Sequence, residues 1–152
     1  MTPGRINEKI VAGKVAIVEE MLRGIASLPL DGEVAFRADP RMVAAGESYL
    51  RRALEALIDL GRHVLARGFG IAVPEYAKVA DELCRAGVLD APTATTLAQM
   101  ARYRNRLVHF YDEIGPPKLF GILSLRRGDI TAALDALRNW LTAHPDLLDT
   151  SL

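Results

Sequence analysis

Apolar residues recur at intervals of three and four along almost the whole of this chain, and the strict alternation typical of β-strands is nearly absent. Such spacing places apolar side chains along one face of a helix and polar side chains along the other. The pattern covers residues 7–27, 40–67, 74–83, 90–112, 118–123 and 129–143. The sequence therefore predicts an all-α protein, an up-and-down antiparallel bundle of about five helices.

Proline, glycine and aspartate mark the expected ends of these helices. The signals are, in chain order, a connector over 28–39, Pro40 as a first helical residue, a stop at Gly68-Phe69-Gly70, Pro74 opening the third helix, Asp90 and Asp129 as N-caps, and a stop at Gly115-Pro116-Pro117. No repeat, low-complexity tract or linker divides the chain, so residues 1–152 are expected to form a single domain. The second helix is apolar over a wide arc, which predicts a homodimer about a two-fold axis.

The composition limits the classes of function. Half of the residues are hydrophobic, and 19 Lys and Arg balance 19 Asp and Glu, which excludes a disordered chain. No apolar run is long enough to cross a membrane and the N-terminus lacks a signal-peptide pattern, so we expect a cytoplasmic protein without membrane contact. Because a nucleic-acid binder usually carries a basic surplus, any RNA contact must come from a local cluster of charge.

The predicted fourth helix carries an arginine on its apolar face. Its core stripe consists of Leu97, Met100, Arg104, Leu107, Tyr111 and Ile114. A buried arginine needs a carboxylate or a phosphate, because burying it unpaired is costly. Glu55 and Asp59 of the second helix are the candidate carboxylates, and an Arg104 side chain that snorkels from the edge of the stripe is the alternative.

His109 follows Arg104 by five residues, which on a straight helix is about 140° of rotation and about 7.5 Å along the axis. The two side chains are therefore not expected on one face. A shared site requires that the long Arg104 side chain swings, that the helix is distorted, or that two chains contribute across a symmetry axis. Arg102 and Asn105 do share a face with His109.

The string Arg104-Asn105-Arg106-Leu107-Val108-His109-Phe110-Tyr111 closely resembles the Arg-x4-His-x-Tyr signature of HEPN domains, and specifically of HepT-like toxins. The resemblance extends to residues 49–59, 61–64, 74–76 and Leu83, and covers about residues 5–143. It implies a helical-bundle dimer that cleaves RNA without a metal, with the Arg and His of both chains lining a cleft at the interface. It also implies a partner, an MntA-like nucleotidyltransferase antitoxin that transfers AMP from ATP to the motif tyrosine, here Tyr111.

The residue types suit metal-independent RNA cleavage. A histidine can take up and release a proton near neutral pH, which gives His109 the acid and base role. Arg104 offers a planar fork of donors for the scissile phosphate, and Asn105 supports the geometry by hydrogen bonding. Arg102 and Arg106 would supply local positive charge for a tRNA or mRNA substrate. No metal-ligand spacing and no cofactor motif is found, so we expect neither group.

A second function remains open, a non-enzymatic HEPN subunit that binds a nucleotide or docks to a nucleotidyltransferase and uses Arg104 for the ligand phosphate. The histidine favours the ribonuclease, because a docking module does not need it. His63 is expected at the surface or an interface, and His144 at the end of the last helix. Cys84 is expected as a small packed residue, since no Cys-His arrangement lies near it.

Overall fold

A computed structural model describes residues 5–109 and 114–150 and confirms the all-α bundle. The elements are β1 (Ile6–Asn7), α1 (Glu8–Ala26), α2 (Glu33–Ala38), α3 (Pro40–Phe69), α4 (Tyr76–Arg85), α5 (Ala91–His109), α6 (Pro116–Leu125), α7 (Arg127–Ala143), a 3₁₀ turn (Pro145–Leu147) and β2 (Leu148–Asp149). The described residues thus hold seven α-helices rather than about five.

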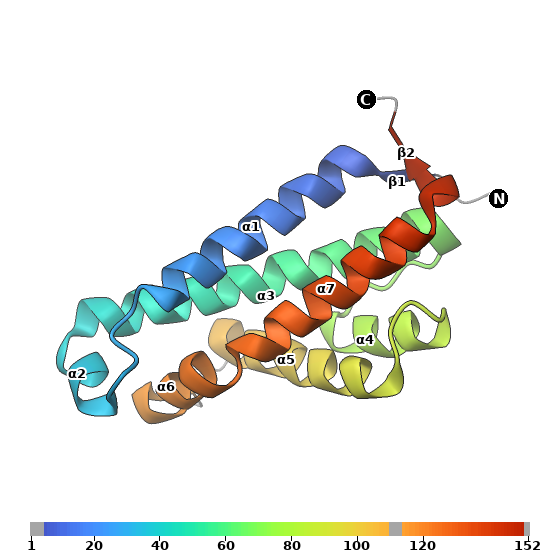
Figure 1. The fold of residues 1–152 in the computed structure, drawn as a ribbon. Coiled ribbons are helices and arrows are strands. Elements are labelled where there is room, and N and C mark those ends of the chain that lie inside the picture. Colours follow the sequence, from blue (N-terminus) through green and yellow to red (C-terminus); the bar gives the residue numbers. More distant parts are fainter. Residues whose placement is uncertain (1–4, 110–113, 151–152) are drawn as a thin grey trace.

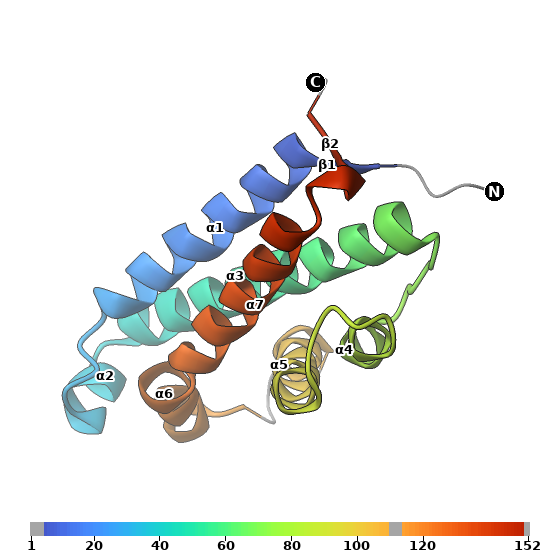
Figure 2. The same cartoon turned by 45° about the vertical axis from the view of Figure 1, so that its right-hand side comes forward.

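The long helix α3 forms the centre of the molecule. It contacts α1 along one side, and it also packs against α4, α5, α6 and α7 (Figure 1). Figure 2 shows α4 and α5 side by side and nearly end-on, while α1, α3 and α7 run across the view, so the α4–α5 hairpin crosses the other three helices. The side chains of Leu54, Leu57 and Leu65 on α3 are fully buried, which places the core around this helix.

A glycine of α3 allows α4 to approach closely. A Cβ atom at Gly61 would lie 2.8 Å from Leu83 Cδ1 and 3.2 Å from Val79 Cγ1, both on α4. Because Gly61 has no side chain, the backbone of α3 can lie directly against side chains of α4 at this point. Arg62 follows directly in α3, so the close approach brings that arginine beside the segment that leads into α4.

Several predicted helix ends are confirmed. Helix α3 begins at Pro40 and ends at Phe69, followed by Gly70 in the left-handed conformation with φ of 70°. This is the conformation that glycine adopts without steric cost after a helix. At the start of α5 the Asp90 carboxylate accepts a hydrogen bond of 2.9 Å from the backbone N–H of Thr93. The pKa of Asp90 is lowered by this hydrogen bond.

Three other predicted boundaries are wrong. Helix α4 begins at Tyr76 rather than Pro74, because the chain is still extended at the residue before Tyr76. Helix α7 begins at Arg127, so Asp129 lies in its first turn, where its charge favours the helix dipole, and is not the N-cap. The helix expected over 118–123 is α6, which begins earlier, at Pro116, since the fixed φ of proline suits the first helical turn. Residues 114 and 115 are not helical, so the predicted stop before the two prolines is confirmed. The predicted end of α5 at Asp112 lies outside the described residues.

The segment 28–39, expected as a connector, contains the six-residue helix α2. Gly32 precedes this helix and no side chain caps it. Its Phe36 is fully buried and packs near Phe120 of α6, with ring centroids 5.8 Å apart. Tertiary packing of one aromatic residue therefore stabilises a helix that is too short to show a period in the sequence.

A two-strand clasp joins the two ends of the described chain. Strands β1 and β2 are parallel, with Ile6 opposite Leu148. The Arg5 guanidinium donates hydrogen bonds to the backbone carbonyls of Asp146 and Leu148. The backbone N–H of Asn7 donates to Nε2 of His63 at 3.0 Å, and this histidine is half-buried. His63 therefore helps to hold strand β1 in place.

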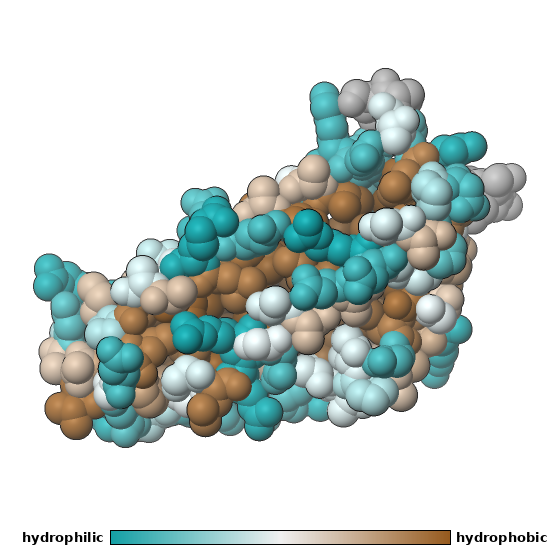
Figure 3. Space-filling model, viewed as in Figure 1, coloured by the Kyte–Doolittle hydropathy of each residue, from teal (hydrophilic) through white to brown (hydrophobic). Residues whose placement is uncertain are grey.

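Helices α1 and α7 both lie on α3 and leave a groove of about 380 Å³ between them. Its apolar lining includes Val11, Val15 and Leu141, and Figure 3 shows a band of hydrophobic side chains along this face. Within the described ranges, no helix combines the length and the apolar character needed to cross a membrane.

Candidate functional site

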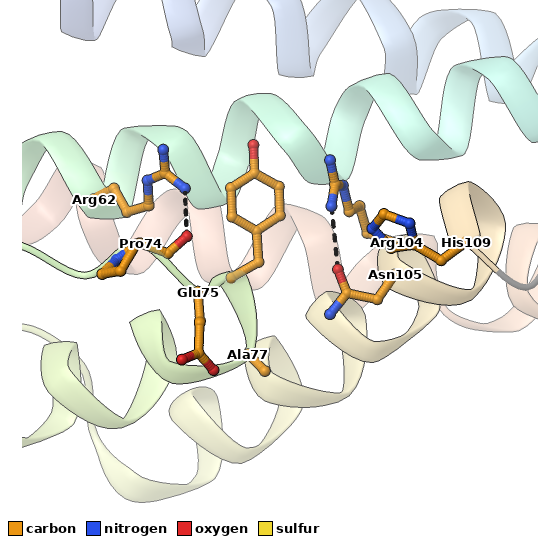
Figure 4. Close-up of a pocket in the computed structure, with 8 residues that line it drawn as sticks. Arg62, Pro74, Glu75, Ala77, Arg104, Asn105 and His109 are labelled. Carbon is orange, nitrogen blue, oxygen red and sulfur yellow. Dashed lines mark hydrogen bonds between the residues drawn. The ribbon is translucent and has the colours of Figure 1, made fainter.

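The strongest candidate site is a pocket of about 480 Å³ where the start of α4 faces the end of α5 beside the C-terminal half of α3. Its lining residues are Arg62, Pro74, Glu75, Tyr76, Ala77, Arg104, Asn105 and His109. They come from three helices and one loop (Figure 4). The pocket thus collects three of the six residues that the sequence singled out.

Arg104 is held by three neighbours. Its Nε donates to Glu55 Oε1 at 3.4 Å, and its Nη1 donates to Asn105 Oδ1 at 3.1 Å. Its guanidinium carbon lies 4.3 Å from the centroid of the Tyr76 ring, a cation–π contact. The Arg104 side chain is 20% exposed. Of the alternatives left open, the structure shows pairing with Glu55, so Arg104 is an anchored cation that still reaches solvent in the pocket.

Tyr76 links the two halves of the site. Its hydroxyl donates a hydrogen bond of 2.7 Å to Asp59 Oδ1, the other candidate carboxylate of α3. Burial, followed by the interaction with Asp59, raises the pKa of Tyr76 to about 12. The hydroxyl therefore stays protonated and remains a donor at neutral pH. The guanidinium carbon of Arg62 also lies over this ring, 4.9 Å from its centroid.

His109 and Arg104 line the same pocket within a single chain. The long Arg104 side chain extends towards Tyr76. This is the first of the three ways in which Arg104 and His109 were expected to be able to share a site. A second chain is thus not needed to bring the two residues to one pocket. His109 is exposed and lies at the C-terminal end of α5. Asn105 lies between them in sequence and fixes one Arg104 nitrogen.

Two predicted site residues, Arg102 and Arg106, are not among the described residues that line this pocket. Arg102 is exposed and its Nε donates to Gln99 at 3.3 Å. Arg106 is half-buried on α5. Tyr111, the expected AMP acceptor, lies outside the described residues.

Arg62 and Tyr76 were not predicted as site residues. Both stand in stretches that carry the family resemblance, which is the one sequence signal that could have selected them. His144, by contrast, lies where it was expected, directly after the last helix, and its Nδ1 donates to the backbone carbonyl of Trp140 at 2.8 Å. Cys84 is half-buried against the core, as expected for a packed residue.

Comparisons with known proteins agree on the fold. A family model described as "Ribonuclease HepT-like" matches residues 18–137, and no curated protein matches the chain. A tri-AMPylated HEPN toxin of Shewanella oneidensis, solved in complex with MNT antitoxin, is similar with a TM-score of 0.77 at 21% identity, over 86% of this chain and 97% of that one. A toxin-antitoxin structure with AMP-PNP has a TM-score of 0.78 at 20% identity, over 87% and 99%. The cytosolic protein YutE from Bacillus subtilis has a TM-score of 0.75 at 14% identity, over 92% and 94%.

Proposed function

This chain belongs to the HepT-like ribonuclease family, and from that membership we propose that it is the toxin of a bacterial toxin-antitoxin system, a metal-independent endoribonuclease that acts in the cytoplasm. The observation that carries the proposal is the single pocket lined by Arg104, Asn105 and His109. The fold shared with a HEPN toxin that was solved in complex with MNT antitoxin supports it. The proposed form is a homodimer in which the pockets of both chains open on one cleft.

The chemistry follows from the donors in the pocket. His109 removes the proton from a ribose 2′-hydroxyl, and the 2′-oxygen attacks the adjacent phosphorus. Arg104 donates to the phosphate oxygens, on which negative charge increases in the transition state. The bond from phosphorus to the 5′-oxygen breaks, and that oxygen receives a proton from a histidinium, for which the second copy of His109 in the dimer is available. The products are a 2′,3′-cyclic phosphate and a 5′-hydroxyl end.

Glu55 has a defined part in this scheme. One carboxylate oxygen of Glu55, Oε1, lies 3.4 Å from Arg104 Nε and 3.4 Å from Arg51 Nη1. The two arginines thus compensate one carboxylate, which leaves net positive charge at the pocket. Such local charge supplies what the neutral chain as a whole lacks for binding RNA.

The proposed regulation is AMP transfer to Tyr111 by an MntA-like nucleotidyltransferase antitoxin. Tyr111 follows His109 by two residues in the sequence. A nucleotide attached there would bring a negative phosphate close to Arg104 and His109, compete for the arginine and fill the pocket. One modification would then block both substrate binding and proton transfer.

The first test is cleavage of a tRNA and mRNA pool in EDTA by the wild type, His109→Ala and Arg104→Ala, each shown to be folded by circular dichroism. We expect cleavage by the wild type with 2′,3′-cyclic phosphate ends, and its loss in both variants. His144→Ala is the matched control, because it removes a histidine outside the pocket, and it should cleave normally. No cleavage by wild-type protein whose mass excludes bound AMP would favour the non-enzymatic binding module, and 3′-hydroxyl ends would contradict the mechanism.

The second test addresses Tyr111. Treatment with the nucleotidyltransferase and ATP should add AMP to the wild type, abolish cleavage and relieve growth arrest. Tyr111→Phe should stay active after the same treatment, and Tyr49→Phe, which alters a tyrosine far along the chain, should be inactivated like the wild type. Inactivation of Tyr111→Phe would show that another group is the acceptor.

A further inference from the structure

Resting on the proposed ribonuclease function, we propose that Arg62 forms a second phosphate-binding position in this pocket. It would hold the phosphodiester next to the scissile one in a single strand of RNA. Arg62 lies on α3, outside the motif that carries Arg104 and His109 on α5. The pocket would then bind two successive phosphates of the backbone, with one guanidinium for each.

Arg62 and Arg104 both contact the ring of Tyr76. The guanidinium carbons of Arg62 and Arg104 lie 4.9 and 4.3 Å from the centroid of Tyr76. Their separation is therefore no larger than these two distances together, a span that successive phosphates of one strand can bridge. Figure 4 shows both guanidiniums at the same level above the start of α4. A strand held at Arg104 presents its next phosphate to Arg62.

Arg62 has donors to offer. Its Nη1 donates to the backbone carbonyl of Pro74 at 3.2 Å. Its nearest approach to a carboxylate is 3.9 Å, from Nη2 to Asp59 Oδ1, which is longer than a hydrogen bond. That carboxylate also accepts the Tyr76 hydroxyl and lies 3.8 Å from the Lys14 ammonium. The charge of Arg62 is thus oriented but only weakly compensated.

The Arg62 side chain is 37% exposed, so a ligand can reach it. Among the described residues that line the pocket, Glu75 is the acidic one, and its carboxylate points away from both guanidiniums in Figure 4. It pairs instead with Lys78 at 3.4 Å. The face that a phosphate would approach is therefore cationic, and a planar guanidinium suits phosphate oxygens.

The test compares binding of two uncleavable 2′-O-methyl ligands, a dinucleotide with one phosphodiester and a trinucleotide with two. We expect the wild type to bind the trinucleotide about tenfold more tightly, as one charge-assisted hydrogen bond at a partly exposed site provides. Arg62→Gln should lose most of this difference. The slope of log affinity against log salt for the trinucleotide should fall by about 0.7, the value for one phosphate contact in a single strand.

Arg52→Gln is the matched control, because it removes the same charge from an exposed position of α3 outside the pocket. It should keep the tenfold difference. Equal weakening of both ligands by Arg62→Gln would overturn the proposal, since it would show that Arg62 only positions Tyr76 or Arg104. A wild type that gains nothing from the second phosphodiester would also overturn it.

Cleavage assays separate this proposal from the proposed function. Wild-type protein that binds the trinucleotide preferentially but cleaves no RNA in EDTA would refute the ribonuclease and retain the second phosphate position. Wild-type protein that cleaves RNA, with a ligand preference unchanged in Arg62→Gln, would refute the second position alone.

Discussion

Removing the hydroxyl of Tyr76 is expected to lower the free energy of unfolding by about 1.5 kcal/mol, the lower end for a hydrogen bond to a charged group. The hydroxyl donates to Asp59 at 2.7 Å. The lower end applies because Asp59 is 28% exposed and has Lys14 and Arg62 within 4 Å, so the carboxylate is not left without partners. Tyr76→Phe keeps the ring, so both cation–π contacts remain.

Tyr76→Leu should cost more, because it removes the ring as well. Each cation–π contact contributes about 0.5–1 kcal/mol at a partly exposed site, so the total loss is about 3 kcal/mol. Without the ring Arg104 keeps Glu55 and Asn105 but loses its third neighbour. RNA cleavage should therefore fall further in Tyr76→Leu than in Tyr76→Phe.

Urea unfolding followed by circular dichroism measures these differences, with an unchanged slope against urea concentration as the sign that the unfolded state is unaffected. Tyr49→Phe is the control, since within the described residues the Tyr49 ring packs against Gly24 and its hydroxyl has no hydrogen bond. If Tyr76→Phe costs no more than Tyr49→Phe, the argument is refuted.

The pH dependence gives an independent check. The pKa of Tyr76 is raised from 10.0 to about 12 in the folded protein. A raised pKa means that the stabilisation is complete below pH 10 and is lost as the pH rises towards 12. The difference in unfolding free energy between the wild type and Tyr76→Phe should therefore shrink over that range. A difference that grows above pH 10 would contradict the assigned hydrogen bond.

Two further predictions concern stability. Gly46→Ala places a Cβ atom 2.6 Å from Leu123 Cδ1 and should destabilise by about 1–3 kcal/mol, whereas Gly13→Ala meets nothing within 4 Å in a helix and should stabilise by about 0.5–1 kcal/mol. Urea unfolding measures both changes, and the packing argument would be wrong if Gly46→Ala were more stable than Gly13→Ala. The pKa of His63 is lowered from 6.5, first by burial and then by nearby cations, and its neutral ring accepts from Asn7. Its contribution is therefore complete above pH 6.5 and lost as the pH falls through the lowered pKa. The difference in unfolding free energy between the wild type and His63→Phe should narrow as the pH falls below 6.5, and a constant difference down to the acid transition would refute this role.

The helical period could be predicted because it depends on local spacing. The long helix α3 and its end before Gly70 follow from apolar residues and one backbone conformation. Helix α2 could not, since its six residues are too few to show a period and depend on the burial of Phe36. The start of α6 was missed for another reason, because a proline pair can either stop a helix or begin one.

The candidate site could be predicted only in part, because local spacing places Arg104 on the apolar face of its helix but does not name its partner. Arg104 on an apolar stripe required a partner, and the structure supplies Glu55, one of two residues that could serve. Asp59, the other candidate, instead accepts from Tyr76, a contact between residues 17 positions apart in different helices. Arg62 stayed unnoticed because its role arises only when α4 packs against α3. Local sequence patterns do not contain such contacts between helices.

The parallel clasp of β1 and β2 determines how the bundle would respond to a pull on its two ends. The chain enters the clasp at Ile6 and leaves it at Asp149, and the strands run in the same direction. Opposite forces on the ends therefore slide the strands along one another, so the interstrand hydrogen bonds are loaded together rather than broken in sequence. The Arg5 guanidinium is bound to the backbone carbonyls of Asp146 and Leu148, so its hydrogen bonds are loaded together with the interstrand ones. The two-residue strands β1 and β2 are thus the first elements to resist a force that would pull a helix out of the bundle.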